Sequence, residues 1–188
     1  MEGMEVRAFG FQFGPLGTTH TFGTFRMEDW EHEDIQVTED EGVSRFKGWT
    51  RLLSSASTEH RSIPGSVFAH LDIAKCEEEI VIKTHLAEYD LSEKLYFVLF
   101  VKADAVQVGP GMRLEQRQLK KYFGPSRSLF IEREGVSVEL DSSSIEEMQV
   151  IPLEGETSFW GADFMIAYEM GQIEGNETWK LRKEIALI

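Results

Sequence analysis

The feature that most constrains this fold is an uninterrupted apolar and aromatic run from Leu95 to Val101, with Lys94 and Lys102 at its ends. The run is too short to cross a bilayer, because a membrane-spanning helix needs about 20 apolar residues. Its branched and aromatic side chains favour a β-strand. Since polar residues do not alternate with the apolar ones, we expect both faces to be buried and the run to form the middle of a sheet.

Composition predicts a folded globular protein. The chain has 188 residues, of which 41% are hydrophobic, including 13 Phe and 4 Trp. This length fits one domain with a sizeable core, and no Pro-rich or Ser-rich linker divides it. We therefore predict a single β-rich domain over residues 1–188.

Charge argues against polyanionic partners. The chain carries 33 acidic and 19 basic residues, a formal net charge of −14. Phosphate-rich partners are repelled by such a field unless one face concentrates the basic residues. The one dense basic stretch, from Arg113 to Lys121, has no second basic cluster to support it. We expect neither nucleic acid nor an anionic membrane surface as a partner.

The single cysteine, Cys76, excludes an intramolecular disulfide framework. The first residues, Met1 to Arg7, show no basic region followed by an apolar run, so neither a signal peptide nor an anchor is expected. A reducing, cytoplasmic location is the prediction.

Alternating apolar and polar residues recur along nearly the whole chain, which is typical of an all-β protein. We predict a single-domain antiparallel β-barrel or β-sandwich with one short helix. Glu134-Gly135 should form a hairpin turn, and the last two strands should pair with each other. The predicted strands span residues 5–13, 20–26, 43–53, 66–73, 79–86, 94–101, 128–133, 136–140, 148–153, 163–170 and 178–186.

The short helix is expected between the breakers Gly109-Pro110-Gly111 and Gly124-Pro125. Met112, Leu119 and Tyr122 lie there at spacings close to one face of a helix. Such a helix would cover an open end or edge of the sheet.

The sharpest candidate site follows from strand alternation. Residues 66–73 and 79–86 would form a hairpin through residues 75–78, with His70 opposite Lys83 and Phe68 opposite His85. Four polar side chains would then share one face. They are His70, Asp72, Lys83 and His85.

These four residues allow two interpretations. As a catalytic set they could supply an acid–base pair or metal ligands for an isomerase, cyclase or hydrolase, although the pattern alone assigns no metal site. As a structural feature they would be the solvated face of a two-stranded ribbon, which alternation produces in every antiparallel sheet.

The four tryptophans, Trp30, Trp49, Trp160 and Trp179, are expected near strand ends or turns. Aromatic rings on a sheet face can stack on a sugar or enclose an apolar ligand, whereas rings in the core only pack. The acidic stretch from Glu28 to Asp34 is expected to be a solvated loop that Trp30 anchors, because the spacing and glycine of a calcium loop are missing.

Common motifs for nucleotide binding and serine nucleophiles are absent from the sequence. The leading prediction is a ligand-binding β domain that takes a small neutral apolar molecule or a saccharide in a cavity or on a concave sheet face. The alternatives are the enzyme described above and a structural or interaction subunit of a larger assembly. Cofactor and oligomeric state are left open.

Overall fold

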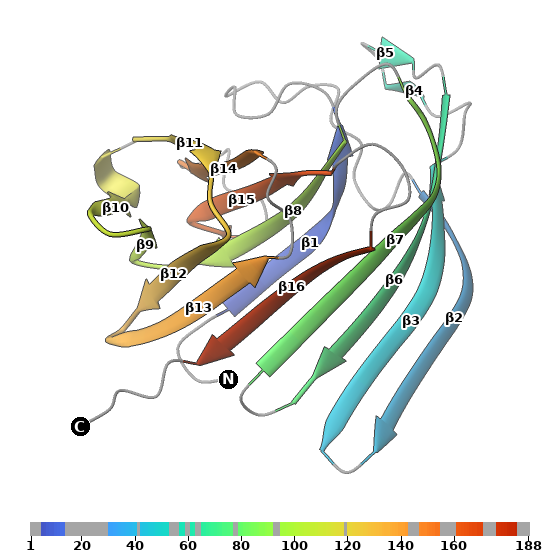
Figure 1. Ribbon diagram of the computed structural model, residues 1–188, viewed down its shortest axis with the longest axis horizontal. Coiled ribbons are helices and arrows are strands. Elements are labelled where there is room, and N and C mark those ends of the chain that lie inside the picture. Colours follow the sequence, from blue (N-terminus) through green and yellow to red (C-terminus); the bar gives the residue numbers. More distant parts are fainter. Residues whose placement is uncertain are drawn as a thin grey trace.

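The computed structural model describes residues 5–13, 30–40, 42–52, 57–58, 61–62, 65–76, 79–91, 95–118, 120–142, 147–154, 161–170 and 176–183. These residues form two large antiparallel β-sheets and one small two-stranded ribbon (Figure 1). The prediction of an antiparallel, mainly β fold is confirmed. Of the two architectures predicted, the closed barrel is wrong, because both large sheets end in free edge strands.

Sheet A has five strands in the order β1-β8-β15-β14-β11. Their bounds are β1 Glu5–Phe13, β8 Leu95–Lys102, β15 Phe164–Glu169, β14 Glu147–Pro152 and β11 Tyr122–Pro125.

Sheet B has nine strands in the order β10-β9-β12-β13-β16-β7-β6-β3-β2. Their bounds are β10 Met112–Glu115, β9 Ala105–Val108, β12 Ser128–Arg133, β13 Val136–Ser142, β16 Asn176–Lys183, β7 Glu79–Leu91, β6 Gly65–Lys75, β3 Val43–Leu52 and β2 Trp30–Asp40. The ribbon pairs β4 Ser57–Thr58 with β5 Arg61–Ser62.

Strand β8 lies inside sheet A, between β1 and β15, and every residue from Tyr96 to Val101 is at most 5% exposed. The prediction of a central strand buried on both faces is confirmed. Phe97, Leu99 and Val101 belong to the core cluster between the two sheets. Sheet B contributes residues such as Leu140 and Leu181 to the same cluster, so this layer joins the sheets.

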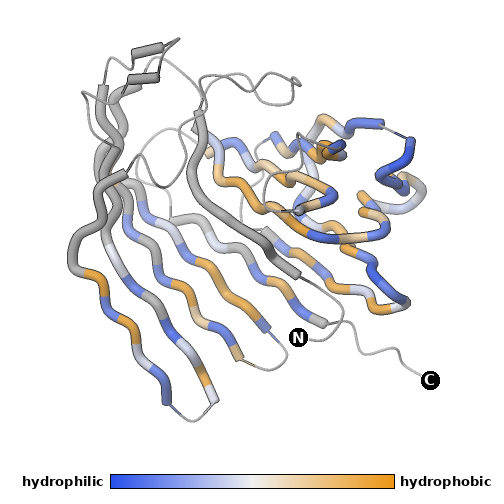
Figure 2. The backbone as a smooth tube through the Cα atoms, turned by 180° about the vertical axis from the view of Figure 1, so that it is seen from behind, coloured by the Kyte–Doolittle hydropathy of each residue, from blue (hydrophilic) through white to orange (hydrophobic). Residues whose placement is uncertain are grey.

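The other face of sheet A is buried as well. Tyr96, Val98 and Phe100 form a second apolar cluster with residues of β14 and β15. Strand β15 is likewise buried along its length from Phe164 to Tyr168. Figure 2 shows the contrast between this continuous apolar colouring and the alternation along the strands of sheet B.

Two aspartates fix the connection from β8 of sheet A to β9 of sheet B. The backbone N–H of Ala103, just after β8, donates to Asp163 Oδ2 at 2.9 Å. The next residue, Asp104, accepts the N–H of Glu134 at 2.7 Å through Oδ2. Glu134 and Gly135 have φ of 52° and 78°, as a two-residue type I′ hairpin turn requires, so the predicted turn is confirmed.

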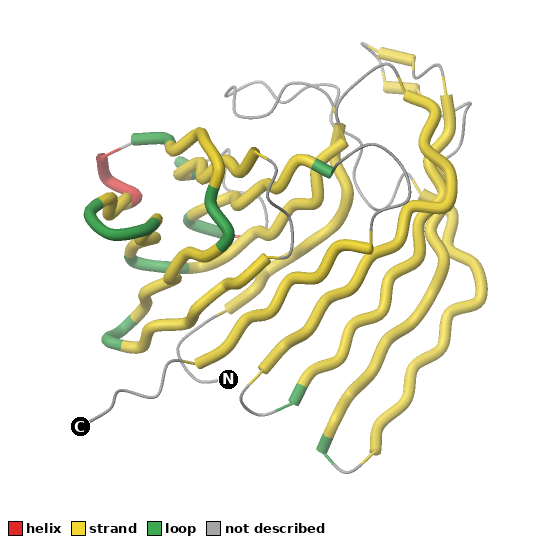
Figure 3. The backbone as a smooth tube through the Cα atoms, in the orientation of Figure 1, coloured by secondary structure: helices red, strands yellow, loops and turns green. Residues whose placement is uncertain are grey.

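The predicted short helix is mostly wrong. Between Gly111 and Gly124 the described residues form strand β10, a three-residue 3-10 turn η2 (Gln116–Gln118) and strand β11 (Figure 3). Leu114 is fully buried and lies in register with Val106 of the neighbouring strand β9, whereas the residues on each side of it are partly or fully exposed. Short strands can show apolar spacings that also fit a helix, and burial at a sheet edge decided between the two here.

Two further sequence predictions need correction. Residues 30–34 of the acidic stretch belong to strand β2 instead of a loop. The last two strands do not pair, because β15 lies between β14 and β8 in sheet A and β16 lies between β13 and β7 in sheet B. Burial on both faces suits β15 to sheet A, whereas the exposed Arg182 beside the buried Leu181 suits β16 to a sheet with one open face.

Sheet B extends beyond sheet A. In Figure 1, β6, β3 and β2 continue away from the region where the sheets overlap. All residues from Ile35 to Asp40 of the edge strand β2 are exposed. A bulge between Glu33 and Gln36 and the acidic residues of this strand are devices that protect an edge from pairing with another chain. No described residues form a helix long and apolar enough to cross a membrane.

We expect Phe97→Ala to lower the free energy of unfolding by about 3 to 5 kcal/mol, because the ring is fully buried between the sheets. Urea unfolding followed by tryptophan emission measures the loss. Phe123→Ala is the matched control: Phe123 is 65% exposed, so its loss should stay below about 0.5 kcal/mol. Equal effects for the two variants would contradict the central position of β8.

Alkaline pH should destabilise the fold through Tyr168. Burial raises the pKa of its phenol, and the negative charge of Asp141 raises it further. In the unfolded chain a tyrosine ionises near pH 10, so stability is unaffected below about pH 10 and falls by about 1.4 kcal/mol per pH unit above it. Tyr168→Phe should remove this part of the loss, whereas Tyr122→Phe, at a partly exposed ring, should not. An equal fall of the free energy of unfolding above pH 10 in the parent, Tyr168→Phe and Tyr122→Phe would contradict the prediction.

Candidate functional site

The candidate site lies on the hairpin of β6 and β7, which pair as predicted. The register differs from the prediction: His70 lies opposite His85, and Asp72 lies opposite Lys83. The expected partners, His70 with Lys83 and Phe68 with His85, are therefore wrong. The hairpin closes at Cys76, whose N–H donates to the Glu79 carbonyl at 2.9 Å, one residue further along the chain than the predicted register would close it.

The shift in register keeps the four residues on one face, because the partner of each residue moves by two positions and side chains alternate with period two. The opposite face carries Ile73 and Ile82, which pair with each other and pack in or against the core between the sheets. His70, Asp72, Lys83 and His85 therefore lie on the face of sheet B that is turned away from sheet A. Lys83 is exposed and the other three are partly exposed.

Neighbouring strands extend these pairs into two rows across the sheet. In the first row, Trp49 of β3 pairs with His70, and His85 pairs with Asn176 of β16. In the second row, Lys47 pairs with Asp72, and Lys83 pairs with Thr178. Such directly opposed positions have β-carbons about 4.5 to 5.5 Å apart.

Strand β3 supplies two cationic side chains that were not among the predicted site residues. Lys47 Nζ lies 3.4 Å from Asp72 Oδ2, and Arg45 Nε lies 3.7 Å from Asp72 Oδ1. The Asp72 carboxylate is thus shared by two cations, which makes it a poor partner for orienting a histidine as a general base. The alternation of Arg45, Lys47 and Trp49 in the sequence already indicates that these side chains share one face of the strand.

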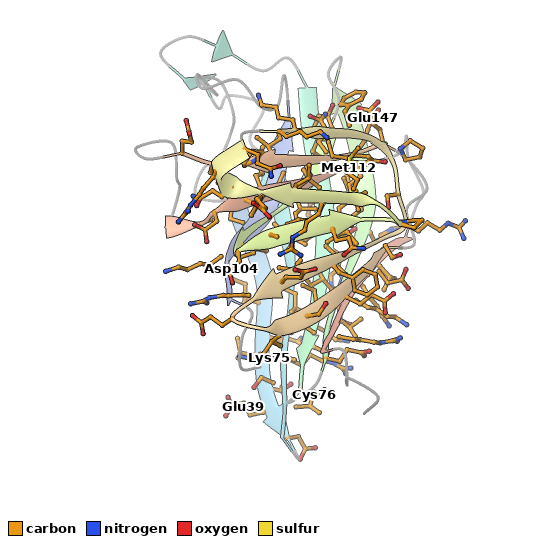
Figure 4. All side chains as sticks on the ribbon, turned by 90° about the vertical axis from the view of Figure 1, so that its left-hand side faces the viewer. Glu39, Lys75, Cys76, Asp104, Met112 and Glu147 are labelled. Carbon is orange, nitrogen blue, oxygen red and sulfur yellow. The ribbon has the colours of Figure 1, made fainter. Side chains whose placement is uncertain are left out.

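One nitrogen of the His85 imidazole is buried. This atom, Nδ1, has no hydrogen-bond partner, although the residue as a whole is only partly buried. Within the described ranges, no group of three or more His, Cys, Asp or Glu side chains is arranged to hold a metal ion. The predicted set of two histidines plus a carboxylate is therefore not assembled as a three-ligand site. Cys76 lies directly after β6, toward the lower end of sheet B in the view of Figure 4.

The tryptophans do not form one group. Trp30 begins β2, as expected for a strand end, whereas Trp49 and Trp179 lie inside strands. Trp49 falls in the row of His70, and Trp179 pairs with Ile82, in the row that belongs to the core-facing side. Trp160 lies outside the described residues. Of the three tryptophan positions that the structure describes, position 49 alone falls beside the four polar residues.

Comparison with known proteins adds no assignment. No protein-family model matches the sequence, and no curated protein is significantly similar to it. No family membership therefore follows for this chain.

Next to this site, on the core-facing side of β7, Thr84 is 2% exposed and its Oγ1 has no hydrogen-bond partner. A buried hydroxyl without a partner costs free energy that an apolar group of the same shape avoids. We expect Thr84→Val to raise the free energy of unfolding by about 1 kcal/mol in urea unfolding. Thr38→Val, at an exposed position of β2, should change it by less than about 0.5 kcal/mol. Destabilisation by Thr84→Val would contradict this prediction, because it would show that the Thr84 hydroxyl forms a hydrogen bond that stabilises the fold.

Proposed function

We propose that this chain is a ligand-binding β-sheet protein that takes a neutral saccharide on the open face of sheet B. The observation that carries the proposal is the pair of rows described above, in which His70, His85, Asp72 and Lys83 share one solvent-facing surface with the backbone position of Trp49. This proposal is the saccharide branch of the ligand-binding function expected from the sequence.

The chemistry of these groups suits sugar hydroxyls. A hydroxyl both donates and accepts hydrogen bonds, so it can accept from the Lys83 ammonium and donate to the Asp72 carboxylate, while an imidazole offers one nitrogen of each kind. An indole ring offers a flat apolar surface on which a sugar ring can stack. The position of Trp49 next to His70 in the register makes it the tryptophan to test.

The same surface suits a small apolar molecule less well. Sites for such ligands are concave and bury about 70 to 90% of the ligand, mostly against apolar side chains. The rows are polar and partly or fully exposed instead, and Ile73, Ile80 and Ile82 of the hairpin pack in or against the core. A neutral sugar is favoured over a polyanionic one because the chain has a net charge of −14 and Asp72 already holds two of the nearby cations.

Titration with neutral oligosaccharides, followed by tryptophan emission in the presence of a chelator, tests the proposal. We expect saturable binding to the parent, and a loss of affinity of about tenfold in His70→Ala, His85→Ala or Trp49→Ala, since one hydrogen bond or ring contact contributes about 1 kcal/mol or slightly more.

Arg113→Ala is the matched control, because Arg113 lies on β10 at the opposite edge of the same sheet. This variant should bind like the parent. Binding of polyanions alone, with steep salt dependence, would overturn the proposal, as would equal affinity in all variants.

A further inference from the structure

The register of β6 and β7 creates a juxtaposition that the sequence did not predict. His70 and His85 are directly opposed on adjacent antiparallel strands and lie on the same face. Directly opposed residues have β-carbons about 4.5 to 5.5 Å apart. Zinc–imidazole bonds are about 2.0 to 2.1 Å long, so two nitrogens on one ion lie about 3 Å apart, which rotation of the two side chains can achieve.

We propose that His70 and His85 form a two-histidine chelate for a divalent transition-metal ion on the open face of sheet B. Imidazole is a preferred ligand for copper, nickel and zinc, whereas calcium and magnesium prefer oxygen. The site does not depend on the saccharide proposal, because no sugar takes part in the chelate.

The surroundings of His85 restrict its geometry. Its Nδ1 is buried, whereas the residue as a whole is partly exposed, so the proposal assigns Nε2 as the metal-binding nitrogen. Enclosure on one side also limits the rotation of the ring, which reduces the side-chain entropy lost when the metal binds. A bulge between Phe68 and Ala69 adjoins the pair, and bulges next to binding sites commonly redirect side chains.

The described His, Cys, Asp and Glu side chains do not supply a third ligand to the metal ion. Asp72, the nearest carboxylate of the set, forms ion pairs with Arg45 and Lys47. The described residues accordingly hold no group of three ligands. Water completes the coordination, so the site should be weaker than structural zinc sites with four protein ligands. The affinity order should be Cu²⁺ first, with Ni²⁺ and Zn²⁺ below it.

Calorimetric titration of the full, tag-free chain with CuCl₂, in the absence of saccharide, tests the proposal. We expect one tight equivalent of Cu²⁺ per chain and an electron paramagnetic resonance spectrum with coupling to two imidazole nitrogens. His70→Ala and His85→Ala should each weaken binding at least tenfold.

Three variants control for other donors: His32→Ala, His60→Ala and Cys76→Ser should leave the affinity unchanged. Retention of the tight equivalent in both His70→Ala and His85→Ala would overturn the proposal, and so would its loss in any of the three control variants or its absence from the parent.

A measurement on the parent protein keeps the test independent of folding defects in the variants. Diethyl pyrocarbonate modifies accessible imidazoles, and peptide mass spectrometry locates the adducts. One equivalent of Zn²⁺ should protect His70 and His85 together but leave His32 and His60 unprotected. Unchanged modification of His70 and His85 would overturn the proposal, whereas failure of the sugar titration in chelator would affect the proposed function alone.

Discussion

The structure depends on the burial of β8 on both faces. Its alternate side chains enter two different apolar clusters, one shared with sheet B and one on the opposite face of sheet A. A strand with no polar face has to be covered twice, so the chain must build a second layer on at least one side of sheet A. Sheet B is that layer, and the chain returns to it directly after β8, where Asp163 and Asp104 fix the connection by accepting hydrogen bonds from backbone N–H groups.

The unequal width of the two sheets leaves several described strands of sheet B outside the shared core. Sheet B has nine strands and sheet A has five, so the strands from β6 to β2 extend past the shared core. Strand β7 lies at this boundary, with Ile82 in the core cluster and Lys83 exposed on the other face. The core therefore anchors the β6–β7 hairpin from behind, while the opposed His70 and His85 lie on its other face and are partly exposed.

Local pattern predicted the strands well where one face was consistently apolar, as in β1, β12 and the hairpin around Glu134-Gly135. It failed for β2, because the acidic residues of an edge strand resemble a solvated loop. It also failed for β10 and β11, whose four residues each are too few to separate a period of two from a helical period. The single-domain prediction stays a prediction, as does the cytoplasmic location.

The sequence by itself determined which side chains share a face. His70, Asp72, Lys83 and His85 stay together under any shift of register by two, because alternation is a property of each strand alone. Only the tertiary structure decided that His70 lies opposite His85, that Arg45 and Lys47 hold Asp72, and that β15 and β16 belong to different sheets. The register of a hairpin follows from the geometry of its turn. The sheet to which a strand belongs follows from burial against residues that are distant in the sequence, so the local pattern does not determine it.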